Sequence, residues 1–587
     1  MADRAAHRAM RNTTMSAGAG HRAMRNTTMA AAAMLLLAAT LPIAASEPPD
    51  PLLRPPIWFD ADDKHVPEPA DRHASELFGI LYNSWFRHLD LHRVGLGIAD
   101  RASLNVNAWD EVPDSSWFTN RIGLHPLAPE EVAAGSPGEA PQPERWSVRS
   151  VKTEGYTPGF QISDEAGRRY VLKFDIPDAL ERNSAAEIVG SRIMHAAGYW
   201  VPQYSIVYFR PENLVRHEEA VREDLFGRER PMTDQDLAEA VALLVERPDG
   251  TVRGSASLFV PGVPIGPFPY WGTRSDDPND IIPHELRREL RGLRVIASWF
   301  NHVDVKEANS LDAYVTEGDK SYVRHYYIDF GSSMGSGDFV NGPCRVGFEN
   351  YYDGGAMTRS FFSLGIWNRP WEENCLILYP EVGRFDRELF DAARWDANYP
   401  NIAFQEADAA DSYWGAKIVT AFTDENVRAL AEAADYTRPA VTGYVEDALL
   451  TRRDRIGAHW FDVVTPLEEF EIDTANDPWV IRFRDLGVER GYAGGAGRSY
   501  TFEVKDARRF EVLEAGSSDT PGRIRIRSTP DVAPAATDRW GRTPVLVVEI
   551  RSRRVDGGPA ELVRVIIGRQ AGEPQLLVLG WAHAPRD

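Results

Sequence analysis

Two short polar motifs in the middle of the chain restrict its fold more than any other feature. The run HVDVKEAN occupies residues 302–309, and Asp329 opens an Asp-Phe-Gly motif further along. A helix with a continuous apolar stripe is predicted over 286–300, and a β-hairpin is predicted over 311–328. The helix would lead into the first motif and the hairpin into the second. We therefore expect the polar side chains of both motifs to converge in one pocket.

These residue types are the ones that phosphoryl transfer needs: a carboxylate for the acceptor's proton, a cation near the moving phosphate, and oxygen ligands for Mg²⁺. The lettering resembles the protein-kinase catalytic loop, His-Arg-Asp-Leu-Lys-x-x-Asn, and its Asp-Phe-Gly metal motif, with Val303 in place of the Arg. The resemblance implies that Asp304 is the catalytic base and that Lys306 is the cation at the γ-phosphate. It also implies that Asn309 and Asp329 bind Mg²⁺ or Mn²⁺.

The predicted order of elements over residues 146–461 also resembles the protein-kinase-like fold. A short Gly loop between two strand-like runs precedes a Lys-bearing strand and then a helix that carries a Glu. The resemblance implies that Lys173 holds the α- and β-phosphates of ATP or another nucleotide, and that Glu187 pairs with this lysine. Gly155 and Gly159 would border the nucleotide. The short Gly loop and the absence of an Ala-Pro-Glu motif are closer to atypical members, such as lipid kinases and secreted spore-coat-type kinases.

A chain of 587 residues is too long for one hydrophobic core, so several domains are expected. The predicted fold class is α+β, with a two-lobed protein-kinase-like domain between an N-terminal helical extension and a C-terminal all-β domain, a sandwich or a small barrel. Seven short strand-like runs separated by turn residues predict that last domain. An extension and linker are expected over 47–145, with a helix over 74–93 and a surface loop over 126–145. The kinase-like domain would follow, with an N-lobe over about 146–262 and a C-lobe over about 263–465 that is mostly helical in 360–461. The β domain is expected over 466–587.

The first 46 residues are predicted to be a signal peptide with an upstream extension, since an apolar run follows Arg25 and ends in small residues. The protein would then be periplasmic, cell-surface or extracellular, and would not span a membrane after cleavage. Cys344 and Cys375 are the two cysteines of the sequence, and a disulfide and a pair of buried thiols both stay open. The net charge of -22 opposes binding to nucleic acid, which is excluded as a partner.

Two other motifs offer alternatives to the phosphotransferase interpretation. Residues 331–335 fit the Gly-x-Ser-x-Gly pattern of serine hydrolases around Ser333, but a poor helix start follows, so this is a remote alternative. His88 and His92 lie four residues apart without a third metal ligand, which favours an ordinary helical face. The sequence therefore predicts a secreted kinase-like phosphotransferase that uses a Mg-nucleotide, with a protein, sugar or lipid acceptor. The second hypothesis is a non-catalytic secreted nucleotide- or ligand-binding protein whose β domain carries the function.

Overall fold

The structure is a computed structural model of the whole chain, and its fold is mixed α/β, with one large mixed sheet and further antiparallel sheets. The residues that it describes are 54–84, 86, 101–152, 159–223, 229–336, 344–351, 353–364, 366–369, 371–372, 377–492, 498–529, 531–554 and 558–585. The predicted signal peptide, Gly155, Cys375 and the histidine pair at positions 88 and 92 lie outside these residues.

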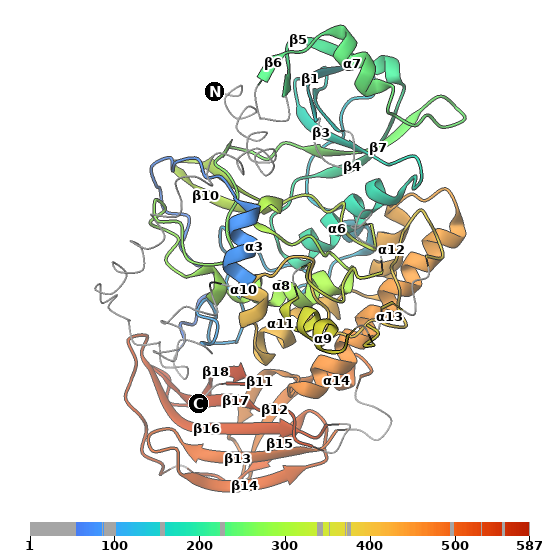
Figure 1. Cartoon of the computed structure of the whole chain (residues 1–587). Coiled ribbons are helices and arrows are strands. Elements are labelled where there is room, and N and C mark those ends of the chain that lie inside the picture. Colours follow the sequence, from blue (N-terminus) through green and yellow to red (C-terminus); the bar gives the residue numbers. More distant parts are fainter. Residues whose placement is uncertain are drawn as a thin grey trace.

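A seven-stranded sheet forms one end of the molecule (Figure 1). Its strand order is β4-β7-β3-β2-β1-β5-β6, and every pairing is antiparallel except that of β1 with β5. Five of these strands are the predicted ones. The strands are β1 (Trp146–Lys152), β2 (Gly159–Ser163), β3 (Arg169–Phe174), β4 (Tyr204–Phe209), β5 (Leu214–Glu223), β6 (Glu229–Pro231) and β7 (Val252–Leu258).

Strands β5 and β6 were not predicted, because their sequences are highly charged and lack alternating apolar residues. In β5, LVRHEEAVRE, only Leu214 and Ala220 are fully buried. The strand pairs in parallel with β1, and this contact cannot be predicted from the local sequence of β5. An inserted helix is predicted over 233–246, and α7 (Asp234–Val241) covers only the first part of that range, with Thr233 accepting a hydrogen bond from the amide of Asp236 at its N-terminus.

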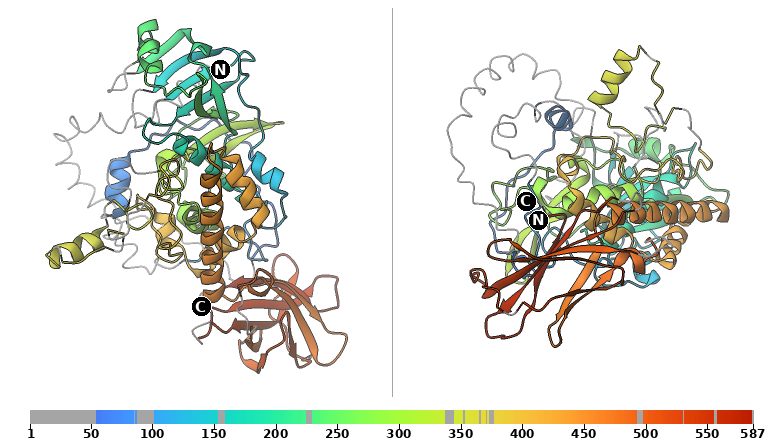
Figure 2. Two further views of the ribbon diagram at one scale, coloured as in Figure 1. Left: turned by 90° about the vertical axis from the view of Figure 1, so that its right-hand side faces the viewer. Right: turned by 90° about the horizontal axis from the view of Figure 1, so that it is seen from below.

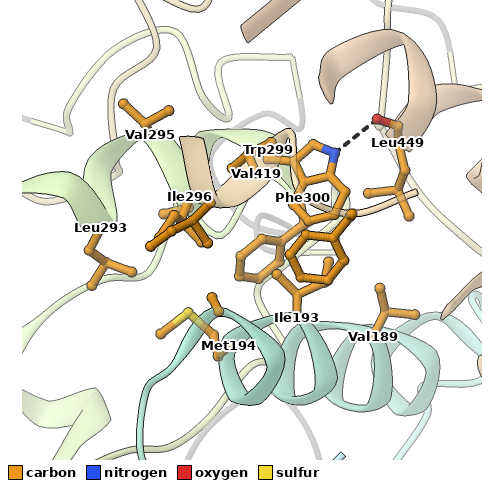
Figure 3. Packing of buried hydrophobic residues seen from close by; sticks show 14 of the residues in the cluster. Val189, Ile193, Met194, Leu293, Val295, Ile296, Trp299, Phe300, Val419 and Leu449 are labelled. Carbon is orange, nitrogen blue, oxygen red and sulfur yellow. Dashed lines mark hydrogen bonds between the residues drawn. The ribbon is translucent and has the colours of Figure 1, made fainter. Parts of the chain in front are cut away.

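Two buried helices contribute to the same apolar core. α6 (Arg182–Ala197) ends at Gly198, and α8 (Arg288–Trp299) carries the predicted apolar stripe. Figure 3 shows Val189, Ile193 and Met194 of α6 packing against apolar side chains of α8, while the Trp299 indole donates to the carbonyl of Leu449 at 2.8 Å. The hairpin that follows, β9 (Ser310–Glu317) and β10 (Lys320–Tyr327), is antiparallel as predicted and also pairs with the short β8 (Val263–Pro264).

The region predicted to be mostly helical is only partly so. α9 (Gly354–Phe362) projects from the body (Figure 2), and the described residues from 363 to 401 contain no helix. That stretch has several prolines, each of which removes a backbone donor and disfavours helix before it. Helices resume with α10 (Ile402–Glu406), α11 (Ala409–Val419), α12 (Asp424–Ala433) and the long α13 (Pro439–Val463).

The C-terminal region is all-β apart from the one-turn α14 (Leu486–Glu489), and it lies at the far end of the molecule from the large sheet (Figure 1). Two antiparallel sheets, β11-β12-β15 and β14-β13-β16-β17-β18, share one apolar core. All seven predicted strands are present, and β11 is additional. The strands are β11 (Leu467–Asp473), β12 (Trp479–Asp485), β13 (Tyr500–Asp506), β14 (Val512–Ser518), β15 (Arg523–Ile526), β16 (Arg542–Ser552), β17 (Val563–Gln570) and β18 (Leu577–His583).

The segment before the large sheet is packed against the body over most of its described length. Its helix α3 (Glu76–Ser84) covers the first part of the predicted one, whose remainder lies mostly outside the described residues. Trp117 and Phe118 are buried in a core shared with α6 and α8. The predicted surface loop contains α5 (Pro129–Ala134), with Val132 fully buried. No helix among the described residues has the length and apolar character that a membrane crossing requires.

Candidate active site

Lys173 bridges two carboxylates that come from different parts of the chain. Its Nζ atom lies 2.6 Å from Glu187 Oε1 and 2.7 Å from Asp329 Oδ1. The lysine is on β3, the glutamate on α6, and the aspartate directly follows Ile328 at the end of the β9–β10 hairpin. The predicted ion pair between Lys173 and Glu187 is therefore confirmed, and Asp329 joins it.

The side chains of β3 alternate between two faces of the sheet, which explains why Lys173 points away from the buried face. Tyr170, Leu172 and Phe174 are fully buried, whereas the alternate residues, which include Lys173, are half-buried on the other face. Gly159 lies directly opposite Lys173 in the β2–β3 ladder, at the start of β2. The second glycine predicted to border the nucleotide, Gly155, is outside the described residues.

Glu187 also fixes the Asp-Phe-Gly segment. Its second oxygen, Oε2, accepts a hydrogen bond from the backbone amide of Phe330 at 3.0 Å. Asp329 has φ 63°, in the left-handed region, and its amide donates to the Tyr204 hydroxyl at 3.3 Å. A Cβ atom on Gly331 would lie 2.3 Å from Asn183 Oδ1, so a larger residue there would displace the Asn183 side chain. The buried glutamate thus holds both the lysine and the backbone that presents Asp329.

The charges around Lys173 favour its cationic form. Burial by itself would lower the pKa of the Lys173 amine, but the carboxylates of Asp329 and Glu187 outweigh that effect and raise it. Burial also raises the pKa of the neighbouring Tyr204 hydroxyl, which stays protonated. The cluster therefore presents a fixed cation beside a carboxylate, Asp329, whose side chain is 37% exposed. This arrangement can bind a phosphate chain together with a cation.

The HVDVKEAN loop brings its three predicted site residues together. The amide nitrogen of Asn309 donates to the Asp304 carboxylate at 2.9 Å and to the Asp304 carbonyl at 2.8 Å. Lys306 Nζ lies 3.4 Å from Asp304 Oδ1 and 4.9 Å from the ring centre of Tyr399. The side chains of Asp304 and Lys306 are about one-fifth exposed. The loop therefore holds a partly accessible carboxylate beside a cation.

Backbone hydrogen bonds join this loop to the Asp329 segment. The amide of Ile328 donates to the carbonyl of Asn309 at 3.1 Å, and the amide of Val303 donates to the carbonyl of Ser332 at 3.2 Å. Between them, the His302 ring lies 5.6 Å from the Phe300 ring and 5.5 Å from that of Phe330. Burial lowers the pKa of His302 to about 4, so this histidine is neutral near pH 7. The two motifs run side by side around an uncharged imidazole.

The donor atoms near Asp329 are oxygens of the kind that Mg²⁺ and Mn²⁺ prefer. Asp329 supplies a carboxylate, and Asn309 keeps its amide oxygen as an acceptor because its nitrogen is bound to Asp304. The described part of the chain contains no group of three or more His, Cys, Asp or Glu residues that could hold a metal. An ion here would therefore rely on these two side chains and on the oxygens of a phosphate, and their assignment as ligands stays a prediction.

Ser333 does not have the surroundings of a hydrolase nucleophile. Its side chain is fully buried, and its hydroxyl is 3.1 Å from His302 Nδ1. Residues 331–336 form turns and are not the start of a helix, which a nucleophile elbow requires. A substrate carbonyl has no access to this hydroxyl, so the Gly-x-Ser-x-Gly match is a coincidence of turn residues. Further along, Cys344 is disulfide-bonded.

Contacts from the N-terminal segment to the HVDVKEAN loop and to Pro400 were not predicted from the sequence. Arg72 lies 3.3 Å from Glu307, within the HVDVKEAN loop, and the Asn83 amide donates to the Pro400 carbonyl at 3.1 Å. These residues are far apart in the chain and carry no shared motif. Co-variation between positions that are far apart in sequence would be needed to predict these contacts.

The sequence matches no known protein-family model and no curated protein. Two solved structures of the Golgi casein kinase are remotely similar to it. The first aligns over 69% of this chain and 94% of its own, with 10% identity and a TM-score of 0.26. The second, with Mn/ADP bound, aligns over 53% of this chain and 73% of its own, with 9% identity and a TM-score of 0.25. At these values the likeness carries no conclusion about function.

Proposed function

We propose that this protein is an exported kinase-like phosphotransferase that transfers the γ-phosphate of a nucleotide, with Mg²⁺ or Mn²⁺, to an acceptor hydroxyl. One observation carries the proposal: Lys173 Nζ lies within 2.7 Å of both Glu187 and Asp329, and backbone bonds tie the Asp329 segment to the loop of Asp304. Phosphoryl transfer depends on positioning and on charge stabilisation more than on covalent chemistry, and these contacts supply both.

Each side chain has a defined part in the proposed reaction. Lys173 neutralises the α- and β-phosphates and is itself oriented by Glu187. Asp304 orients the acceptor hydroxyl and takes its proton. Asn309 and Asp329 would hold the divalent cation, which offsets the negative charge of the phosphates.

Lys306 has a double role in this scheme. Its ammonium pairs with Asp304 in the structure, and it is placed to approach the γ-phosphate as negative charge shifts during transfer. The lysine is partly exposed and has a flexible stem, so it can exchange the carboxylate for a phosphate oxygen at little cost. Val303 replaces the arginine of the kinase loop, and its side chain is fully buried among apolar residues.

The architecture under this proposal is a two-lobed catalytic domain over about 146–465, followed by a separate β domain over 466–587. Lys173 and Glu187 would belong to the first lobe, and the remaining site residues to the second. Export rests on the apolar run near the N-terminus. A nucleotide supply outside the cytoplasm is a requirement of the proposal.

Nucleotide binding tests the proposal directly. Calorimetry would measure ATP and ADP affinity of the purified full-length protein with Mg²⁺, with Mn²⁺ and with EDTA. We expect cation-dependent binding that Asp329→Ala abolishes and that Lys173→Ala weakens at least tenfold. Asp319→Ala, at the exposed turn of the β9–β10 hairpin, is the matched control and should bind like wild type.

The same experiment distinguishes the proposed phosphotransferase from the competing hypothesis, which is a non-catalytic binding protein. Wild-type protein that binds no nucleotide with either cation would exclude the kinase interpretation and favour a binding function in the β domain. Binding without transfer to any acceptor would identify a nucleotide-binding protein without catalysis.

A further inference from the structure

Helix α9 projects from the body and carries large apolar side chains that are exposed (Figure 2). It begins after Asp353, whose carboxylate accepts a hydrogen bond from the amide of Ala356 at 2.7 Å. Large apolar residues on α9 and just after it are more than half exposed: Met357 55%, Phe361 75%, Phe362 77%, Leu364 89% and Ile366 84%. Soluble monomers seldom expose such a patch, which marks a contact surface for a protein or a membrane.

Leu364 is the clearest sign that this patch serves a contact outside the fold. Its φ of 51° lies in the left-handed region, where a residue other than glycine is strained and where asparagine is better tolerated than leucine. Its side chain is the most exposed of the large apolar residues in the described part of the chain. Neither the backbone conformation nor internal packing favours leucine at this position, whereas a contact with an apolar environment does.

A second apolar helix lies on the same side of the molecule. In both views of Figure 2, α3 (blue) and α9 (yellow) extend toward the same side. Phe78 and Leu81 of α3 are 58% and 41% exposed, and Phe86, close after this helix, is 58% exposed. Two helices on one side can contact a flat surface together, whereas the groove of a protein partner typically holds a single helix. The two helices with these exposed residues form one surface, the α3–α9 surface.

Both helices are anchored beside the same short stretch of backbone. The Asn83 side chain of α3 donates to the Pro400 carbonyl at 3.1 Å. The amide of Tyr351, shortly before α9, donates to the Asn398 carbonyl at 2.7 Å. The amide of Asn398 in turn donates to the carbonyl of Val303 at 2.8 Å, within the HVDVKEAN loop. The α3–α9 surface therefore adjoins this loop.

The α9 part of the surface carries little charge. Residues 354–371 contain two arginines and no lysine, aspartate or glutamate, in a chain of which 26% is charged. Arg369 pairs with Glu349 at 3.0 Å, and Arg359 lies 5.7 Å from the ring centre of Trp367. Phe, Leu and Ile side chains together with Trp and Arg are typical of segments at the boundary between lipid headgroups and acyl chains. The surface thus fits apolar insertion better than an electrostatic contact.

We propose that the α3–α9 surface binds a phospholipid bilayer, with Phe361, Phe362 and Leu364 inserted at the boundary between headgroups and acyl chains. The protein is then a peripheral membrane protein, and its HVDVKEAN loop is held close to the bilayer. Apolar insertion drives the contact, because the net charge of -22 opposes attraction to anionic headgroups. Such binding does not require catalysis, so it is independent of the phosphotransferase function proposed above.

Sedimentation with phosphatidylcholine vesicles tests this surface in the protein purified after export, from which the apolar run near the N-terminus is expected to be removed. We expect wild-type protein to bind these vesicles and to stay bound at high salt, since salt screens charges and not apolar contacts. Hydrogen exchange with and without vesicles gives a local measurement. The amides of α3 and α9 should exchange more slowly with vesicles, and those of β14 should not change.

Leu364→Asn separates binding from folding. Asparagine suits the left-handed backbone, so the melting temperature should stay equal or rise, while vesicle affinity should fall about tenfold. Phe361→Ser combined with Phe362→Ser should lower the affinity about a hundredfold with little change in melting temperature, because both side chains are largely exposed. Val512→Ser is the matched control, since Val512 is 53% exposed on β14, and this variant should bind like wild type.

Several results would contradict membrane insertion. Wild-type protein that binds no vesicles would exclude it. Binding that requires anionic lipid and is lost at high salt would indicate adsorption by charge, and binding that these substitutions leave unchanged would place the contact elsewhere. Light scattering without vesicles is the last check. A dimer that dissociates when Phe361 and Phe362 are changed to serine would show that a second copy covers this surface.

Discussion

Asp110 and Asp329 have similar backbones and opposite surroundings. Both are in the left-handed region, with φ 57° and 63°, and both form ion pairs with buried cations. Asp110 is 3% exposed and contacts Arg54, Arg288 and His583 at 2.7–3.0 Å, whereas the Asp329 side chain is 37% exposed. The carboxylate of Asp110 is thus enclosed by protein partners, and that of Asp329 can still reach a ligand.

The surroundings of the two aspartates extend this difference. Near Asp110, Arg288 also pairs with the buried Asp411, and Lys417 pairs with Glu468 of β11 at 3.0 Å. These contacts join the N-terminal segment, the helices and the C-terminal sheets. Burial alone would raise the pKa of Asp110, but Arg288 and the His583 hydrogen bond outweigh it, so the pKa is lowered. Charge in this network holds parts of the fold together, whereas the charges around Lys173 include the partly exposed carboxylate of Asp329.

The largest expected effect is on catalysis. Asp304→Asn should reduce phosphate transfer by about 10²–10⁴-fold, because it removes the group that takes the acceptor's proton. Nucleotide affinity should stay within a few-fold of wild type, since Asp304 acts on the acceptor. Steady-state transfer assays and calorimetry measure the two quantities. Equal losses in both would mean that Asp304 serves nucleotide binding instead.

The matched pair Asp110→Asn and Asp329→Asn tests the structural side of the comparison. Asparagine tolerates the left-handed backbone at both sites, so the change is one of charge. Asp110→Asn leaves buried arginines without their full charge partner and should cost about 3–5 kcal/mol. Asp329→Asn should cost less than about 1 kcal/mol, because the site is partly exposed and Lys173 keeps Glu187. Thermal unfolding of both variants measures the two losses of stability. Similar losses in both variants would contradict the proposed difference between Asp110 and Asp329.

His302 is expected to make the stability of the protein depend on pH. Its pKa is about 4 in the folded protein, below the ordinary value of 6.5, so its contribution to stability is present above pH 6.5. That contribution is lost as the pH falls from 6.5 to 4, by about 2–4 kcal/mol in total. His302→Gln should flatten the fall in unfolding temperature over this range. An unchanged pH profile in the variant would show that other groups cause it.

Much of the fold was predictable because its elements carry local signals. The stripe on α8, the alternation of β3 and the turn-separated runs of the C-terminal sheets depend on residues close together in sequence. The pairing of Lys173 with Glu187 followed from a motif. The bond from Phe330 to Glu187, the parallel pairing of β5, and the contact of Arg72 with Glu307 were missed. Each of these joins distant segments whose local sequences carry no mark of the partner.

A modest effect is expected when the C-terminal region is separated from the rest. Residues 466–587 contain all eight strands β11–β18 and their shared core, so the fragment should fold alone. It loses buried contacts at its junction: Glu468 with Lys417, His583 with Asp110, and Arg542 with the carbonyl of Arg54 at 2.5 Å. These polar groups become solvated rather than orphaned, so the loss should be modest, about 1–2 kcal/mol. Circular dichroism and NMR of the fragment would show a β fold with a lowered melting temperature. A disordered fragment would mean that the junction network is required for folding and that the domain boundary is wrong.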